Sequence, residues 1–199
     1  QGEALKVGDL KFVDYNGDGR ITDEDKTNIG DPNPDVTMGI NLGFDWKGLD
    51  FALTGYAALG QQVAYAGYRR FADSGQDNFT TAVYNYWVGE GSSNKYPQLN
   101  VMNTGMNWQS ISDIYMQNGS YFRLQNITLG YDFNRLVKSS PFSQFRLYVQ
   151  AQNLFTITGY EGMDPENGKS IGNEQWVTGV DVGNYPNPRT FVVGVNVKF

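Results

Sequence analysis

The chain has 199 residues, with 21 acidic and 15 basic side chains, a formal net charge of -6, no cysteine and no histidine. The absence of cysteine excludes disulfides and thiol chemistry, and the absence of histidine removes the usual general base and zinc ligand. An acidic balance with scattered Lys and Arg argues against nucleic acid as a partner, because phosphate binding needs a clustered basic surface.

The first motif in the chain is the segment DYNGDGRITDED at 14–25. Its oxygen donors and its glycine recur at the spacing of an EF-hand calcium loop, in which alternate residues of a tight loop face a hard cation. The predicted ligands are Asp14, Asn16, Asp18, the backbone carbonyl of Arg20, and Asp25. Asp instead of Glu at the last position predicts modest affinity, on the order of 10⁻⁴ to 10⁻³ M, for a structural calcium ion. The alternative is an Asn-Gly-Asp-Gly turn without metal.

Strict alternation of apolar and polar residues begins at Val36. Residues 36–46 and 49–54 each carry one apolar parity, and Lys47-Gly48 separates them. Alternation predicts strands with one apolar face, and a connection of two residues predicts a β-hairpin. We therefore divide the chain into an N-terminal loop at 1–35, which contains the calcium motif, and strands with their loops at 36–199.

Residues 60–112 show no sustained alternation and contain many aromatic residues and amides. We expect a long loop with a short helix near Asp77 to Tyr86. A connection of this length without regular structure is unusual unless it is functional. Two interpretations of its aromatic residues stay open here: stacking on a ligand, or packing on one another.

Alternation returns at 121–133, at 145–152 and at 190–199. In the last stretch, TFVVGVNVKF, every residue on one parity is apolar from Phe191 to Phe199. The opposite parity of these strands is polar, and we expect it to line a channel or to contact a plug. The predicted lining residues are Asn126, Asp132, Arg146, Gln150 and Gln152.

Connection lengths and aromatic positions together indicate an outer-membrane barrel. Short connections alternate with long ones, as short periplasmic turns alternate with long extracellular loops in such barrels. One predicted aromatic level contains Phe44, Trp46, Tyr131, Phe133, Phe145 and Phe199, and the opposite level contains Tyr121, Phe155 and Phe191. We predict an all-β chain whose antiparallel strands, about five, form the C-terminal part of a transmembrane β-barrel. Since so few strands cannot close, we expect the two edge strands to pair with missing strands of a parent barrel, or with a second copy of this chain if it is prepared alone.

Five stretches carry a family resemblance: GDLKFVDYNGDGRITDEDKTNIGDPNPDVTMGINLGFDWKGLDF, YNYWVGEGSSNKYPQL, NGSYFRLQNITLGYDF, RLYVQAQNLFTITGYEGMDPE and YPNPRTFVVGVNVKF. In this order they resemble the C-terminal end of the SusC-like (RagA-like) TonB-dependent outer-membrane transporters of Bacteroidetes. The resemblance implies a barrel with an N-terminal plug in the cell outer membrane, in contact with lipid. It also implies a SusD-like lipoprotein partner, contact with TonB through a missing N-terminal part, and uptake of oligosaccharides or peptides.

Two other functional classes compete with this interpretation. A soluble, calcium-stabilised β-module that binds carbohydrate would have to cover its outward faces with a second sheet. A dockerin-like adhesion element would need two calcium loops, and the sequence has one. We expect no enzyme, because paired carboxylates such as Asp23 with Asp25 and Asp164 with Glu166 lie in turn-rich segments typical of solvated charge or cation binding.

Overall fold

The computed structural model describes residues 6–67, 81–99, 107–108, 111–136, 141–166, 178–183 and 185–199. The chain forms two compact units. The strand unit comprises Pro32–Gln62, Asn118–Glu166 and Asn184–Phe199, and the loop unit comprises Gln1–Asp31, Val63–Gln117 and Asn167–Gly183. The division at residue 35 suggested by the sequence stays a prediction.

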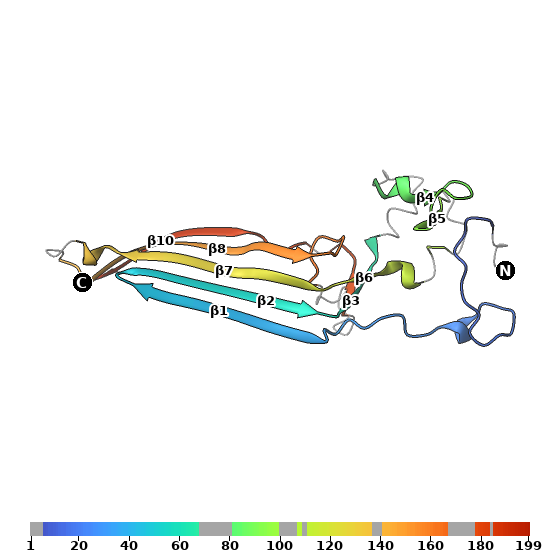
Figure 1. The fold of residues 1–199 in the computed structure, drawn as a ribbon, viewed down its shortest axis with the longest axis horizontal. Coiled ribbons are helices and arrows are strands. Elements are labelled where there is room, and N and C mark those ends of the chain that lie inside the picture. The colour runs from blue at the N-terminus through green and yellow to red at the C-terminus, as the bar shows by residue number, and fades with distance from the viewer. Residues whose placement is uncertain are drawn as a thin grey trace. The chain divides into compact units, whose positions relative to one another are not determined.

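The strand unit is an antiparallel sheet of five long strands (Figure 1). Their bounds are β1 (Val36–Trp46), β2 (Leu49–Leu59), β7 (Tyr121–Asp132), β8 (Gln144–Thr158) and β10 (Thr190–Lys198). The spatial order is β1-β2-β7-β8-β10, so the five strands lie side by side in the order in which they occur along the chain. All five predicted strands are confirmed, and β2 and β8 continue beyond the alternating stretches that predicted them.

The predicted hairpin between β1 and β2 is confirmed. Trp46 pairs with Leu49, and the two connecting residues have positive φ angles, 49° at Lys47 and 92° at Gly48. Two consecutive positive φ angles are those of a type I′ turn, whose twist matches that of the flanking strands. The other short connection contains the 3-10 turn η4 (Phe133–Arg135). Figure 1 shows that the β1–β2 turn and the C-terminus lie at the same end of the sheet.

A β-bulge in β7 changes which side chains face outward. Asn126 pairs with Thr54 and Leu124 pairs with Gly55, so Gln125 is an extra residue in the ladder. One extra residue reverses the parity of everything beyond it. The placement of Tyr121 on the outward aromatic level is therefore wrong: its ring lies 6.1 Å from that of Tyr56 on the opposite face.

The loop unit contains short elements only among its described residues. They are η1 (Asp23–Asp25), β3 (Gln62–Tyr65), η2 (Thr81–Asn85), β4 (Tyr86–Trp87), β5 (Tyr96–Gln98), η3 (Asp113–Tyr115), β6 (Met116–Asn118) and β9 (Val180–Asp181). The helix expected near Asp77 to Tyr86 lies partly outside the described residues, and its described part is the 3-10 turn η2.

Aromatic residues of the long loop pack on one another. Tyr86, Tyr96, Trp108 and Tyr115 form a buried cluster, with the rings of Tyr86 and Tyr96 5.4 Å apart and those of Trp108 and Tyr115 5.8 Å apart. For these four residues the structure favours packing over direct contact with a ligand. In the described part of the chain, no helix has the length and apolar character needed to cross a membrane.

Candidate functional site: the two faces of the sheet

One face of the five-stranded sheet is apolar and uncovered. This apolar face is the side that carries Phe44, Phe51, Leu129, Val149 and Val193, which pair with one another across the five strands. The exposed large apolar side chains of β1, β8 and β10 range from 36% exposed at Phe145 to 73% at Val193. Large contiguous apolar surfaces mark sites of contact with membrane or protein. The second sheet that a soluble module requires does not cover this face among the described residues.

Aromatic side chains form a connected level at the short-turn end of the apolar face. Ring centres of Tyr131 and Phe133 are 5.1 Å apart, those of Phe133 and Phe145 6.0 Å, and those of Phe142 and Phe199 5.2 Å. The ring of Phe142 also contacts that of Phe145, at 6.2 Å. These contacts confirm the predicted level for Tyr131, Phe133, Phe145 and Phe199. They also add Phe142, which lies in the turn where no alternation signals a facing direction.

The hairpin carries a further aromatic pair, in the row of the apolar face that also contains Leu129 and Val149. The rings of Phe44 and Phe51 stack at 5.3 Å, and Lys47 Nζ lies 5.0 Å from the ring centre of Trp46. At the other end of the apolar face, Phe155 contacts Phe122 at 6.5 Å. Phe122 thus occupies the position that the sequence assigned to Tyr121, because the bulge shifts the parity by one.

The opposite side, the polar face, brings together the residues predicted to line an interior. Asn126 pairs with Gln152, and Asp132 pairs with Arg146. The side chain of Gln150 donates a hydrogen bond to Asn126 Oδ1 at 2.8 Å. Polar side chains that bond to one another along a sheet stay satisfied in a confined interior. The alternation rule therefore placed these five residues on one face correctly.

An ion pair crosses three strands of the polar face above a glycine. Arg146 Nε on β8 donates to Asp50 Oδ2 on β2 at 2.7 Å, and Arg146 Nη2 donates to Asp50 Oδ1. Between them lies Gly130 of β7, where a Cβ atom would stand 2.4 Å from Asp50 Oδ2 and 2.5 Å from Arg146 Nη2. Alternation did not reveal this pair, since its members are 96 residues apart in the sequence.

A second glycine on the polar face supports an aromatic ring beside this bridge. A Cβ at Gly194 of β10 would lie 2.4 Å from the ring of Tyr148, and the Arg146 guanidinium stands 4.8 Å from the same ring centre. The side chains of Arg146 and Tyr148 therefore lie flat along the polar face of the sheet. Glycine on a polar parity is the sequence signal that could have indicated such a close approach.

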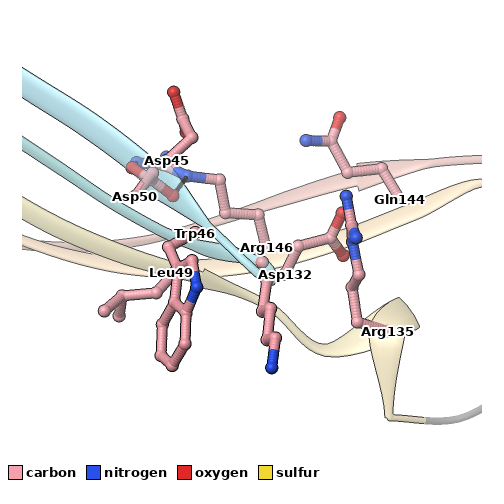
Figure 2. A pocket seen from close by; sticks show the side chains of 10 residues that line it. Asp45, Trp46, Leu49, Asp50, Asp132, Arg135, Gln144 and Arg146 are labelled. Atoms are coloured by element: carbon pink, nitrogen blue, oxygen red, sulfur yellow. Dashed lines mark hydrogen bonds and ion pairs between the residues drawn. The ribbon is translucent and has the colours of Figure 1, made fainter.

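A hollow of about 430 Å³ lies beside the bridge at the short-turn end. Its lining residues are Asp45, Trp46, Lys47, Gly48, Leu49, Asp50, Asp132, Arg135, Gln144 and Arg146. Figure 2 shows the side chains of Asp45, Arg135 and Gln144 on one side of the sheet and those of Trp46 and Leu49 on the other. The hollow thus presents carboxylates, two guanidinium groups and an amide, groups that suit a polar occupant.

The predicted calcium ligands lie in the loop unit and fold the backbone around their carboxylates. Asp14 accepts the N–H groups of Gly17 at 2.6 Å and Gly19 at 2.8 Å. Asp25 accepts those of Thr22 at 2.7 Å and Tyr15 at 2.9 Å. The N–H of Thr22, with those of Tyr15 and Asn16, lowers the pKa of the Asp25 carboxyl below its ordinary value.

The donor chemistry of this loop suits calcium, whose ligands are oxygens. Gly17 and Gly19 have φ angles of 76° and 78°, which provide the sharp bends that such a loop needs. No group of three or more His, Cys, Asp or Glu side chains is placed to hold a metal ion within the described ranges. That grouping leaves out the amide of Asn16 and the carbonyl of Arg20, so the calcium site stays a prediction.

Curated proteins are similar to this chain along its whole length. No protein-family profile matches the chain. The chain is 36% identical over 202 aligned residues, 100% of its length, to TonB-dependent receptor P3 of Formosa agariphila, of which it covers 20%. It is 32% identical over 94% of its length to the TonB-dependent receptor SusC of Bacteroides thetaiotaomicron, of which it covers 17%. The chain therefore spans about one fifth of the length of these curated relatives.

Solved structures share its fold. The RagAB peptide transporter aligns with a TM-score of 0.64 and 26% identity, covering 84% of this chain and 17% of that one. The RagAB peptide importer in its closed-closed state aligns with a TM-score of 0.66 and 25% identity, covering 94% and 20%. These relatives are receptors and transporters and not enzymes, as predicted. The chain is thus a SusC- and RagA-like section of the TonB-dependent transporters, a family of outer-membrane β-barrel proteins.

Proposed function

We propose that the strand unit is part of the barrel wall of a TonB-dependent transporter that imports nutrients such as oligosaccharides or peptides. The observation that carries this proposal is the presence of an uncovered apolar face and a polar face on the same five strands. A transmembrane wall needs this arrangement, because one side meets lipid and the other meets water or a plug. The levelled aromatic rings at the short-turn end support the proposal, since aromatic residues concentrate at membrane interfaces.

The partners follow from the proposed family role. We propose that the full-length protein works with a SusD-like lipoprotein and with TonB, which it contacts through sequence outside this chain. RagAB is described as a peptide importer, which supports peptides as one substrate class. Oligosaccharides are the other class, which the resemblance of the sequence to SusC-like transporters implies.

We also propose a structural calcium ion for the loop at 14–25. Its ligands would be Asp14, Asn16, Asp18, the carbonyl of Arg20, and Asp25. In this role the ion crosslinks the loop and does no chemistry. An affinity of about 10⁻⁴ to 10⁻³ M suits the calcium concentration outside a cell.

The experiment that tests the membrane proposal is fractionation of the full-length gene product. We expect it to sediment with outer membranes and to migrate faster in detergent gels before heating than after. A lipoprotein of the SusD type should copurify from mild detergent. Recovery of the full-length product as a soluble monomer would contradict the barrel assignment. A barrel that copurifies with no lipoprotein would contradict only the proposed partner.

A further inference from the structure

The buried side chain of Arg123 lies at the end of the polar face away from the β1–β2 turn. It is 4% exposed, and its Nε donates a hydrogen bond to Thr156 Oγ1 on the neighbouring strand β8 at 3.0 Å. The guanidinium also stands 5.4 Å from the ring centre of Tyr121. These contacts fix the side chain against the sheet and leave its two terminal nitrogens for other partners.

Two carboxylates from the loop after β8 bind those nitrogens. Arg123 Nη2 donates to Asp164 Oδ1, and Nη1 donates to Glu166 Oε2. The segment that precedes β10 joins the same cluster through Asn187. Its backbone N–H donates to Asp164 Oδ2 at 3.1 Å, and its side-chain amide donates to Glu166 Oε2 at 3.3 Å. One arginine therefore ties to the sheet both the residues that follow β8 and those that precede β10.

The two carboxylates differ in how firmly they are held. The Asp164 side chain is 9% exposed and also accepts the backbone N–H of Glu166 at 2.9 Å, whereas the Glu166 side chain is 45% exposed. Burial raises the pKa of Asp164, but the N–H groups of Glu166 and Asn187 and the Arg123 guanidinium outweigh it and lower the pKa below its ordinary value. Losing one partner of a buried ion pair is strongly destabilising, because the other charge is left buried and unpaired. Losing one partner of a half-exposed pair costs little, because solvent screens the remaining charge.

We propose that Arg123 is a positioning residue that latches to the polar face the residues that follow β8 and those that precede β10. Asp164 is the contact that stays formed, and Glu166 is the contact that can be released. Movement of residues 159–166 away from the sheet then begins with release of Glu166 while Asp164 stays bound to Arg123. The latch depends only on contacts inside the strand unit, so it does not rest on the proposed transport function.

The test follows the mobility of a spin label at Met163, whose side chain is 70% exposed beside the latch. The label is attached to Met163→Cys in the full-length protein after any other cysteines are replaced. We expect Arg123→Gln and Asp164→Asn to shift the opening equilibrium by on the order of a hundredfold and to give a mobile spectrum. We expect Glu166→Gln to shift it by less than about tenfold. Arg123→Lys keeps the charge without the fork that spans both carboxylates, so its spectrum should lie between those of Arg123 and Arg123→Gln.

Arg146→Gln is the matched control, because it breaks the other ion pair of the polar face and should leave the Met163 label immobile. Circular dichroism checks the fold of each variant, and this check does not depend on a membrane. A wild-type spectrum in folded Arg123→Gln would overturn the latch. An effect of Glu166→Gln equal to that of Asp164→Asn would overturn the division into two halves. If Arg123→Gln does not fold, the comparison of the two carboxylate variants decides the proposal.

Discussion

Replacing Val149 with Arg tests whether the apolar face meets lipid. Val149 lies on β8 between the aromatic levels at Phe145 and Phe155, pairs with Leu129 and Val193, and is 48% exposed. An arginine at an exposed position in water needs no repacking and changes the free energy of unfolding by no more than about 0.5 kcal/mol. The same arginine near the middle of a bilayer costs about 2–4 kcal/mol. The loss of unfolding free energy expected in lipid is thus large enough for a denaturation experiment to distinguish it from the change expected in water.

The assay is urea unfolding of the full-length protein from phospholipid vesicles, followed by tryptophan fluorescence and by gel migration without heating. The matched control is Gln152→Arg, on the same strand but on the polar face, where we expect a change below about 1 kcal/mol. Stability of Val149→Arg within about 0.5 kcal/mol of the wild type would refute the lipid assignment. Equal destabilisation by both substitutions would refute the assignment of the two faces.

Three further predictions concern other parts of the chain. Gly130→Ala should destabilise the protein by up to about 1 kcal/mol in the same unfolding assay, because its Cβ would displace the partly exposed ion pair above it; Gly39→Ala, where a Cβ meets nothing within 4 Å, should not. The pKa of Asp164 is lowered in the folded protein, so its contribution to stability is complete above the ordinary pKa of 3.8 and is lost as the pH falls through the lower, folded pKa. The Met163 label should therefore become mobile only below pH 3.8. Asp14→Asn should weaken calcium binding, measured by calorimetry, at least about tenfold. Equal calcium affinity of the variant and the wild type would remove Asp14 from the ligand set.

Strand positions and facing directions followed from local alternation. In β1 and β10 every apolar residue of one parity lies on the apolar face, because a strand turns successive side chains to opposite sides whatever its neighbours are. The hairpin at Lys47-Gly48 is likewise local, since the turn needs only two residues with positive φ angles. The polar lining residues followed from the same rule.

The aromatic residue at the far level shows where local reasoning failed. A single extra residue, Gln125, moved Phe122 outward and Tyr121 inward. A bulge depends on how β7 registers against both β2 and β8, and alternation within one strand carries no record of that register. Packing among the aromatic residues of the long loop was one of two interpretations of the sequence. Only the structure shows which of them gather, since the cluster joins residues without a shared period.

By itself, then, the sequence determined the five strands, the short connections between them, and their apolar and polar sides except in β7 before Gln125. It also determined the family, because its similarity to the receptors extends over the whole chain. Only the tertiary structure decided which charges meet. The bridge between Asp50 and Arg146 joins residues 96 positions apart, and the latch joins Arg123 to Asp164 41 positions away. Such pairs exist because strand pairing and loop return bring distant segments together, and no periodicity within one segment encodes that meeting.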